Sequence, residues 1–409
     1  MASMKYYLTE VDKNTSKGVA QKNLLAKRSI ITFMAVNGAC TLADLAAELN
    51  MSIPTVTKLV AELGDDEIVV DYGKIETSGG RRPNLYGLAQ SAIYFAGVDV
   101  RHRTIGFVLT DLKNNVIDIQ RDIPFELINT PECLEELARI IKEYIDGLEI
   151  DNDKIMGIGV NLSGRINSAS GYSYYYFNWT EKPLSEYLEE RIGYKILIEN
   201  DTRSSCYAEY MVGPYQGVKN VIYFYLYYGM SVGIIIDGKL YYGKSGFSGE
   251  FGHIPYYDNQ IICQCGKKGC LETEVSGLAL EREIKRRIEG GHSSLLADKH
   301  KKGKEIEIDD ILEAAMKDDM LSIELIEEMG EKAGKAISML INLFNPELFI
   351  VAGAMAEAGD YFMLPLKAAV NKYSLSLVNK DTEFAVAKLG DDAGLLGVAM
   401  LIRKRILGL

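Results

Sequence analysis

The sequence predicts an α/β protein in which a small helical head, residues 1–88, precedes a body of two similar α/β lobes. Three observations support this fold class. Capped helical segments follow one another between residues 22 and 63, a similar order of strands and helices occurs twice after residue 93, and three of the six cysteines crowd into residues 263–270. In a chain of 409 residues, crowded thiols indicate a metal site rather than a disulfide framework.

The charge is divided unevenly along the chain. Formal charges cancel within residues 1–88, so the body carries the whole net charge of −12. A neutral head on an acidic body favours DNA binding by the head, because the body is repelled from DNA. Apolar stretches such as residues 233–237 are far shorter than the ~20 residues of a membrane span. Residues 1–9 also lack the apolar run of a secretion signal, so we expect a cytoplasmic protein without a membrane partner.

The head begins with two predicted helices. Apolar residues recur at helical spacing over Lys22–Val36, and Asn37-Gly38 ends this first helix. Thr41 and Asp44 form an Asp variant of the capping box at the start of the second helix, Leu42–Leu49.

A third helix begins after Ser52, which caps it, and runs to about Leu63. Counted from Ala46, three residues fall at +4, +10 and +13, the spacing by which helices cross in a DNA-binding helix-turn-helix: Asn50, Val56 and Leu59. The exposed face would present a polar row to the major groove, consisting of Ser52, Thr55, Thr57 and Lys58. The alternative is an ordinary helical hairpin, which shows the same apolar pattern.

Two short apolar runs, Ile68–Val70 and Leu85–Leu88, surround a polar and basic tip and predict a wing. Gly79-Gly80 lets the backbone approach DNA, and Arg81 and Arg82 can enter the minor groove or clamp phosphates. A solvated basic loop is the alternative. With its wing, the head is predicted to be a winged helix-turn-helix.

The body shows one order of elements twice. Its first half has three β-type runs, a helix and a further strand: Ile93–Val100, Thr104–Thr110, Val116–Ile123, Pro131–Tyr144 and Ile155–Val160. The second half repeats this order with Val221–Leu226, Gly233–Asp237, Lys239–Tyr242, several helices, a strand at Leu348–Val351 and a closing helix. We expect one lobe over residues 89–199, to which the helix at 391–409 returns, and a second over residues 200–390.

The sharpest local pattern lies in the second lobe, between residues 253 and 270. Three thiolates and one imidazole supply the four ligands of a closed, tetrahedral structural zinc site: His253, Cys263, Cys265 and Cys270. Unmetallated core cysteines are the alternative, but the glycines at 266 and 269 favour a ligand loop over packed secondary structure.

These residues stand in two blocks, Ser248-Gly-Glu-Phe-Gly-His253 and Cys263-Gln-Cys-Gly-Lys-Lys-Gly-Cys-Leu-Glu272, which resemble the signature of the ROK family of repressors, open reading frames and sugar kinases. Other blocks resemble the family as well: Gly157–Val160 through Gly164-Arg165, Glu199–Asp201, Gly233–Gly238 and Asp391–Gly397. The head, including Gly79–Pro83, is similar to that of the family's xylose and N-acetylglucosamine repressors. The resemblance implies an actin-like body of the sugar-kinase and Hsp70 type, with a sugar between its lobes.

The resemblance also implies a set of residues that ring a pyranose sugar: Gly164, Arg165, Asn200, Asp201, Glu250, His253 and Glu272. Asp201 matches the base that takes the proton of the attacking sugar hydroxyl in the family's kinases. Because a predicted helix follows directly, Asp201 can also be a helix cap, and the two roles are compatible.

The nucleotide side departs from the kinases of the family. Those kinases follow the first-strand Asp with two glycines and a Thr, whereas this chain has Asp99-Val-Arg-His-Arg-Thr104. The hairpin Tyr227-Tyr-Gly-Met-Ser-Val-Gly233 and the segment Gly353-Ala-Met355 also carry side chains where the kinases have glycines. Side chains at these places obstruct the approach of backbone amides to phosphate oxygens, so ATP binding is not expected.

We therefore expect a sugar-responsive transcriptional repressor that binds operator DNA as a homodimer or homotetramer and senses a sugar or sugar phosphate. An active sugar kinase with a regulatory head is the alternative, and a head that binds another protein is a third. The tyrosines of Tyr172-Ser-Tyr-Tyr-Tyr176 can stack on a sugar, bind a larger glycan or form the plain surface of a β-rich lobe.

Overall fold

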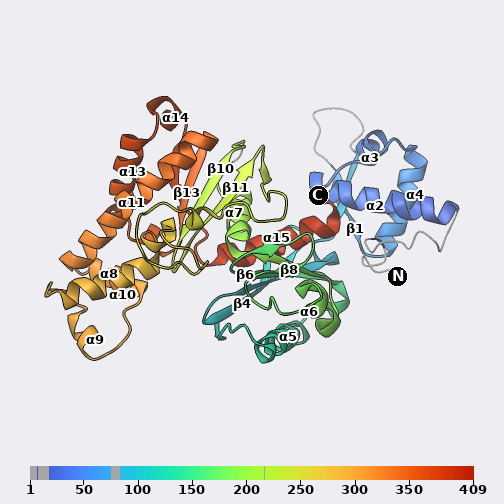
Figure 1. The fold of residues 1–409 in the computed structure, drawn as a ribbon. Coiled ribbons are helices and arrows are strands. Elements are labelled where there is room, and N and C mark those ends of the chain that lie inside the picture. Colours follow the sequence, from blue (N-terminus) through green and yellow to red (C-terminus); the bar gives the residue numbers. More distant parts are fainter. Residues whose placement is uncertain (1–6, 8–17, 75–82, 216) are drawn as a thin grey trace. The chain divides into compact units, whose positions relative to one another are not determined.

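The computed structural model describes residue 7 and residues 18–74, 83–215 and 217–409. The chain forms two compact units, which we call unit 1 (Met1–Ser204 with Gly394–Leu409) and unit 2 (Ser205–Ala393) (Figure 1). No described helix combines the length and the apolarity that a membrane span requires.

Among the residues that the structure describes in the head of unit 1, three helices and a two-stranded antiparallel sheet follow residue 18. These elements are α2 (Val19–Asn37), α3 (Leu42–Glu48), α4 (Ile53–Asp65), β1 (Val69–Lys74) and β2 (Asn84–Leu88). The predicted capping box of α3 is present, because the Thr41 hydroxyl accepts from the Asp44 N–H and the Asp44 carboxylate accepts from the Thr41 N–H. Ser52 caps α4 by accepting from the Thr55 N–H.

The crossing of α3 and α4 follows the predicted spacing. Ala46, Val56 and Leu59 are all buried, and Asn50 adopts the left-handed conformation with a φ of 52°. The small Ala46 and the turn at Asn50 let the two helices approach each other. The winged helix-turn-helix predicted from the sequence is confirmed.

The rest of unit 1 is built on a five-stranded sheet in the order β5-β4-β3-β6-β9. Its strands are β3 (Tyr94–Val100), β4 (Thr104–Asp111), β5 (Val116–Pro124), β6 (Ile155–Leu162) and β9 (Ile196–Asn200), and a small hairpin pairs β7 (Ile166–Asn167) with β8 (Tyr172–Ser173). The helices are α5 (Pro131–Asp146), α6 (Leu184–Ile192), the start of α7 (Asp201–Val212), nearly all of α15 (Asp392–Leu407), and the short 3-10 helices η1 (Gln90–Ala92) and η2 (Asn152–Lys154).

Unit 2 contains a second five-stranded sheet, in the order β12-β11-β10-β13-β14. Its strands are β10 (Val221–Leu226), β11 (Met230–Ile236), β12 (Lys239–Leu240), β13 (Leu348–Ala352) and β14 (Glu383–Val386). In both sheets the first three strands are antiparallel, and the last two are parallel to the first. The repeat predicted from the sequence is therefore a repeat of sheet topology.

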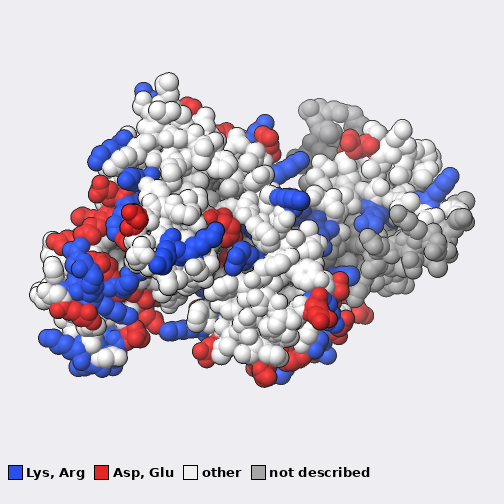
Figure 2. Space-filling view, in the orientation of Figure 1, with Lys and Arg blue, Asp and Glu red and all other residues white. Residues whose placement is uncertain are grey.

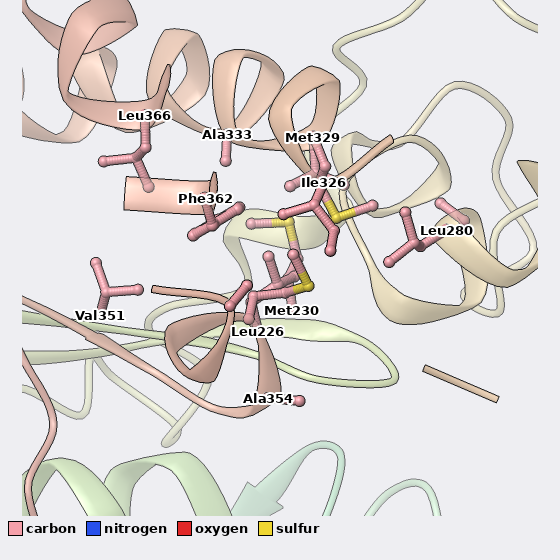
Figure 3. Packing of buried hydrophobic residues seen from close by; sticks show 14 of the residues in the cluster. Leu226, Met230, Leu280, Ile326, Met329, Ala333, Val351, Ala354, Phe362 and Leu366 are labelled. Atoms are coloured by element: carbon pink, nitrogen blue, oxygen red, sulfur yellow. The ribbon is translucent and has the colours of Figure 1, made fainter. Parts of the chain in front are cut away.

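The helices of unit 2 bury a large apolar core against its sheet. Besides the rest of α7, they are α8 (Gly277–Glu289), α9 (Ala297–Lys301), α10 (Ile308–Ala315), α11 (Met320–Phe344), α12 (Ala354–Glu357), α13 (Asp360–Tyr373), α14 (Ser376–Lys380), η3 (Phe251–His253) and η4 (Leu271–Thr273). Figure 3 shows side chains of α11 and α13, such as Ile326 and Phe362, packed in one cluster with Leu226 and Met230 of the sheet.

Charges of both signs mix over α8, α9 and α10 (Figure 2). Several of these charges pair with each other, including Lys285 with Glu305 and Lys299 with Asp310. The lysine-rich stretch at 299–304 therefore belongs to a solvated surface with acidic partners at hand.

Helix α15 packs on the unit 1 sheet at backbone contact distance. A Cβ on Gly159 of β6 would lie 2.5 Å from the Val398 carbonyl oxygen, and a Cβ on Gly397 would lie 1.9 Å from the Ser204 carbonyl oxygen. Only glycine fits at such distances. Further along α15, the Arg403 guanidinium donates to the Leu112 carbonyl at 2.7 Å and to the Ala35 carbonyl of α2 at 3.2 Å. Helix α15 thus contacts both the sheet and the head of unit 1.

We expect Gly397→Ala to lower the free energy of unfolding by about 1–3 kcal/mol or more, because the added methyl overlaps the backbone of Ser204. Urea unfolding followed by circular dichroism measures the change. Gly64→Ala in α4 is the matched control, since the nearest atom to its Cβ would be 3.7 Å away. There alanine should be neutral or stabilise by up to about 1 kcal/mol. Equal stability of the Gly397→Ala variant and the wild type would contradict the close packing of α15.

Candidate functional sites

The predicted DNA-contacting residues lie at the start of α4, which Ser52 caps. Ser52, Thr55, Thr57 and Lys58 are exposed, and they alternate with buried Val56 and Leu59. Two of the hydroxyls are already engaged locally, because Ser52 and Thr55 share a 2.7 Å hydrogen bond and Thr57 donates to the Ile53 carbonyl. Lys58 has 70% of its side chain exposed. Arg81 and Arg82, the predicted residues at the tip of the wing, lie outside the described residues.

Polar residues gather where three parallel strands of unit 1 end. Asp99, Asn161 and Asn200 lie at or near the carboxyl ends of β3, β6 and β9, the edge at which α/β sheets bind ligands. The buried Asn161 amide donates to Asp99 at 3.2 Å and to the Gly394 carbonyl at 2.8 Å, and its oxygen accepts from the Ser204 hydroxyl. Sequence reasoning missed Asn161 and Ser204. A lone polar residue in the apolar run of β6 was the signal that could have found Asn161.

Three of the predicted sugar-binding residues of unit 1 meet at this edge. The Asn200 amide donates to the Gly164 carbonyl at 3.1 Å and to the Asp201 carboxylate at 3.0 Å. The cap of α7 is Asn200, whose side-chain oxygen accepts from the Arg203 N–H, while Asp201 accepts from the adjacent Thr202 N–H. The fourth residue, Arg165, is exposed and follows Gly164.

An ion pair with little exposure supports this segment from behind. Arg203 and Glu199 lie 2.6 Å apart with 5% and 1% of their side chains exposed. Glu199 also accepts from the Asn200 N–H at 2.7 Å, and Arg203 donates to the Ile166 carbonyl. Because every charge in the pair has further hydrogen bonds, the pair fixes the end of β9 and the start of α7.

The surroundings of Asp201 favour its protonated form. Burial, followed by the charge of Asp99, raises the pKa of Asp201 from 3.8 to about 6, against the opposing effect of the Thr202 N–H. A carboxyl group with a pKa near neutrality can both donate to and accept from a sugar hydroxyl.

The predicted metal ligands of unit 2 come together. His253, Cys263, Cys265 and Cys270 place one ligand atom each within 4.8 Å of all the others. Cys263 Sγ lies 3.4 Å from His253 Nδ1, and Cys265 Sγ lies 3.6 Å from Cys270 Sγ. The chain between them turns tightly, with the Gly266 N–H donating to the Cys263 carbonyl. The described residues thus contain a four-ligand cluster that could hold a metal ion.

The other predicted residues of unit 2 surround the same histidine. One Glu272 oxygen lies 3.6 Å from His253 Nδ1, and a Glu250 oxygen lies 3.7 Å from His253 Nε2. Glu272 also accepts from the Met230 N–H at 3.2 Å, which ties it to the β10–β11 hairpin. The structure therefore brings Glu250, His253 and Glu272 together.

Side chains make local contacts in two segments where the sequence predicts an obstructed approach to phosphate: the turn after β3 and the end of β10. In unit 1, Arg101 forms an ion pair with the buried Asp99 at 2.9 Å. In unit 2, the rings of Tyr227 and Tyr228 lie 4.5 Å apart at the end of β10. In each segment the side chains therefore contact residues of the same unit.

Known proteins match both the head and the body. Residues 95–405 match the ROK family, and residues 26–70 match a winged helix-turn-helix DNA-binding domain. The xylose repressor of Bacillus subtilis (strain 168) is 27% identical over 394 residues, 96% of this chain and 96% of that protein. The glucokinase of Streptomyces coelicolor is 30% identical over 317 residues, 75% of this chain and 97% of that protein. The crystal structure of a ROK family transcriptional regulator, a homologue of the E. coli Mlc protein, has a TM-score of 0.76 at 26% identity, covering 95% of this chain and 97% of that chain.

We expect Asp201→Asn to stabilise the protein at pH 8 and to have little effect near pH 4. The raised pKa means that ionising Asp201 costs folding free energy as the pH rises through about 4 to 6, and asparagine removes that cost. The gain should be on the order of 1–3 kcal/mol. Urea unfolding of both proteins at the two pH values measures it. A variant less stable than the wild type at pH 8 would show that the ionised carboxylate is well compensated.

Proposed function

The chain belongs to the ROK family, and from this premise we propose that it is a sugar-responsive transcriptional repressor whose winged head binds operator DNA. The observation that carries this proposal is the polar row of α4, which is exposed along its length and backed by a buried helix-turn-helix core. Relatives described as a xylose repressor and as a ROK transcriptional regulator match the chain over both head and body, which supports the same function.

In this proposal, residues 1–88 form the DNA-binding domain. Ser52, Thr55, Thr57 and Lys58 contact the major groove, and Arg81 and Arg82 of the wing contact the minor groove or phosphates. Operators with two half-sites require an even number of heads, so we propose a homodimer or homotetramer. Its place of action is the cytoplasm.

The proposed effector is a sugar or a sugar phosphate. Its contacts come from Gly164 and Arg165 in a first lobe of residues 89–199 with the helix at 391–409, and from a second lobe of residues 200–390, which supplies Asn200, Asp201, Glu250, His253 and Glu272. A sugar that binds one conformation of the body better than another shifts the population of DNA-binding heads. Within unit 1, α15 joins the polar edge of the sheet to the head, because the Gly394 carbonyl contacts Asn161 and Arg403 contacts Ala35 of the head.

We propose that the His/Cys₃ cluster holds a structural zinc ion. With Zn–S bonds of about 2.3 Å and Zn–N bonds of about 2.0 Å, neighbouring ligand atoms of a tetrahedral site lie roughly 3.5–3.8 Å apart. Two of the separations, 3.4 and 3.6 Å, are close to these values, and all four ligand atoms lie within 4.8 Å of one another. Four protein ligands leave no open position, so the ion would fix the loop of residues 253–270 and orient His253.

The second candidate is sugar phosphorylation, since Asp201 is retained and a glucokinase is among the relatives. The Arg101–Asp99 ion pair and the tyrosines at the end of β10 favour a body that does not position ATP. ADP release with a panel of hexoses, abolished in Asp201→Asn, would reverse this preference.

We expect Lys58→Ala to weaken binding to the DNA upstream of the protein's own gene about tenfold, because it removes a cationic side chain from the DNA-facing row. Fluorescence anisotropy with a labelled fragment measures the affinity. Lys142→Ala, which removes an exposed lysine of α5, is the matched control and should bind as the wild type. If the wild-type protein binds no genomic fragment in preference to random DNA, the repressor proposal fails.

We expect Cys265→Ser to reduce the zinc content well below one ion per chain and to lower sugar affinity about tenfold, because His253 serves both the metal and the sugar. Atomic absorption and isothermal titration calorimetry report the two effects. Cys133→Ser changes a half-buried cysteine outside the cluster and should alter neither. Unchanged sugar affinity in zinc-free protein would contradict the predicted dependence of sugar binding on the metal.

A further inference from the structure

Residues 172–179, which we call the aromatic segment, hold four tyrosines, a phenylalanine and the tryptophan of the chain beside the polar edge of unit 1. Tyr174, Tyr175 and Trp179 are 47%, 37% and 41% exposed. Exposed aromatic side chains at this density are uncommon on a protein surface without a ligand or partner, because each leaves a large apolar area in water.

The aromatic segment adjoins the proposed sugar-binding residues directly. A Cβ on Gly164 would lie 2.6 Å from the Cβ of Tyr175, so this tyrosine packs on the glycine itself. The Tyr174 N–H donates to the Arg165 carbonyl at 2.9 Å, next to the β7–β8 hairpin. Tyr176 lies within reach of the Asp201 charge, which, after burial and Tyr175, contributes to raising the pKa of Tyr176.

The fold holds the aromatic segment in a fixed shape. Phe177 is 1% exposed and has a φ of 56°, a left-handed conformation that costs a non-glycine residue of this size on the order of 1–3 kcal/mol. Asn129 braces the turn, because its oxygen accepts from the Phe177 N–H and its amide donates to the Tyr175 carbonyl and to Asn178. A strained and braced turn keeps the neighbouring rings exposed, and strain of this kind concentrates at ligand-binding sites.

We propose that the aromatic segment is a second sugar subsite, which takes the next pyranose ring of a β-linked gluco- or xylo-oligosaccharide. This inference rests on the proposed function and specifies its ligand. In β-linked glucose and xylose units the hydroxyls are equatorial, so both faces of each ring present C–H groups that stack on flat aromatic side chains. The first ring is held by the polar residues around Asn200 and Asp201, and the second ring by Tyr174, Tyr175 and Trp179. The continuity between Gly164 and Tyr175 favours a sugar ring over a protein partner.

The chain carries its own reporter for this site, because Trp179 is its single tryptophan. We would titrate the full-length protein with glucose, xylose, cellobiose, xylobiose and cellotriose, following tryptophan emission and measuring affinities by calorimetry. We expect at least one disaccharide to bind at least tenfold more tightly than its monosaccharide and to shift Trp179 emission, whereas the monosaccharide leaves the emission unchanged.

Variants separate stacking from a merely structural role. Tyr174→Ala should reduce affinity for the disaccharide about tenfold more than affinity for the monosaccharide, and Tyr174→Phe, which keeps the ring, should restore it. Tyr373→Ala is the matched control, because it truncates a tyrosine of 39% exposure on α13 and should bind both sugars as the wild type.

Three results would overturn the inference. If a monosaccharide binds but no disaccharide binds more tightly, or if a bound disaccharide leaves Trp179 emission unchanged, the second subsite is wrong and the sugar-sensing function stands. If no sugar binds at all and the intact aromatic segment captures only protein, both the subsite and the proposed effector class fall together.

Discussion

The structure of unit 1 depends on the backbone contact between α15 and the sheet. Gly159 and Gly397 let carbonyl oxygens of α15 and α7 come closer than any side chain would permit. This contact places the Gly394 carbonyl against Asn161, and Asn161 in turn joins Asp99 to Ser204. The same helix carries Arg403 to the end of α2. The polar edge and the head are therefore both organised around one helix whose position allows almost no adjustment.

The two sheets share one topology but differ in where their polar residues lie. In unit 1 the parallel strands β3, β6 and β9 end in Asp99, Asn161 and Asn200, which make a dense hydrogen-bonded edge. In unit 2 the predicted metal-binding and sugar-binding side chains lie instead on the connection between β12 and α8, which contains the cysteine-rich loop. This loop is held by backbone hydrogen bonds of its own, such as those from the Tyr256 N–H to the Gly269 carbonyl and from the Cys263 N–H to the Lys267 carbonyl. His253 belongs to the four-ligand cluster and also lies between Glu250 and Glu272.

Local chemistry made much of this predictable from the sequence. The helix-turn-helix followed from the Thr41–Asp44 capping box and the spacing from Ala46 to Leu59. The ligand cluster followed from one histidine and three cysteines at close spacing, a combination that few other roles require. The duplicated lobes followed from repeated strand order. The contacts that the sequence could not predict are tertiary. Arg101 pairs with a residue only two positions away, whereas Asn161 meets Ser204 and Gly394 only because the chain folds. Likewise Asn200, rather than Asp201, caps α7 because the turn aims its side chain back at Arg203. The tip of the wing, with Arg81 and Arg82, lies outside the described residues, and the domain limits and sugar contacts stay predictions.

Because unit 1 combines residues 1–204 with residues 394–409, its folding joins segments that lie far apart in the sequence. Unit 2 is continuous in sequence, and its sheet and helices are complete when the ribosome has passed residue 393. The face of the unit 1 sheet that carries Gly97 and Gly159 has no cover until α15 leaves the exit tunnel. Until then, nascent chains expose this apolar face, and a product that terminates early carries a head on an incomplete support. The support of the head is therefore complete only after residues 394–409 have followed the whole of unit 2.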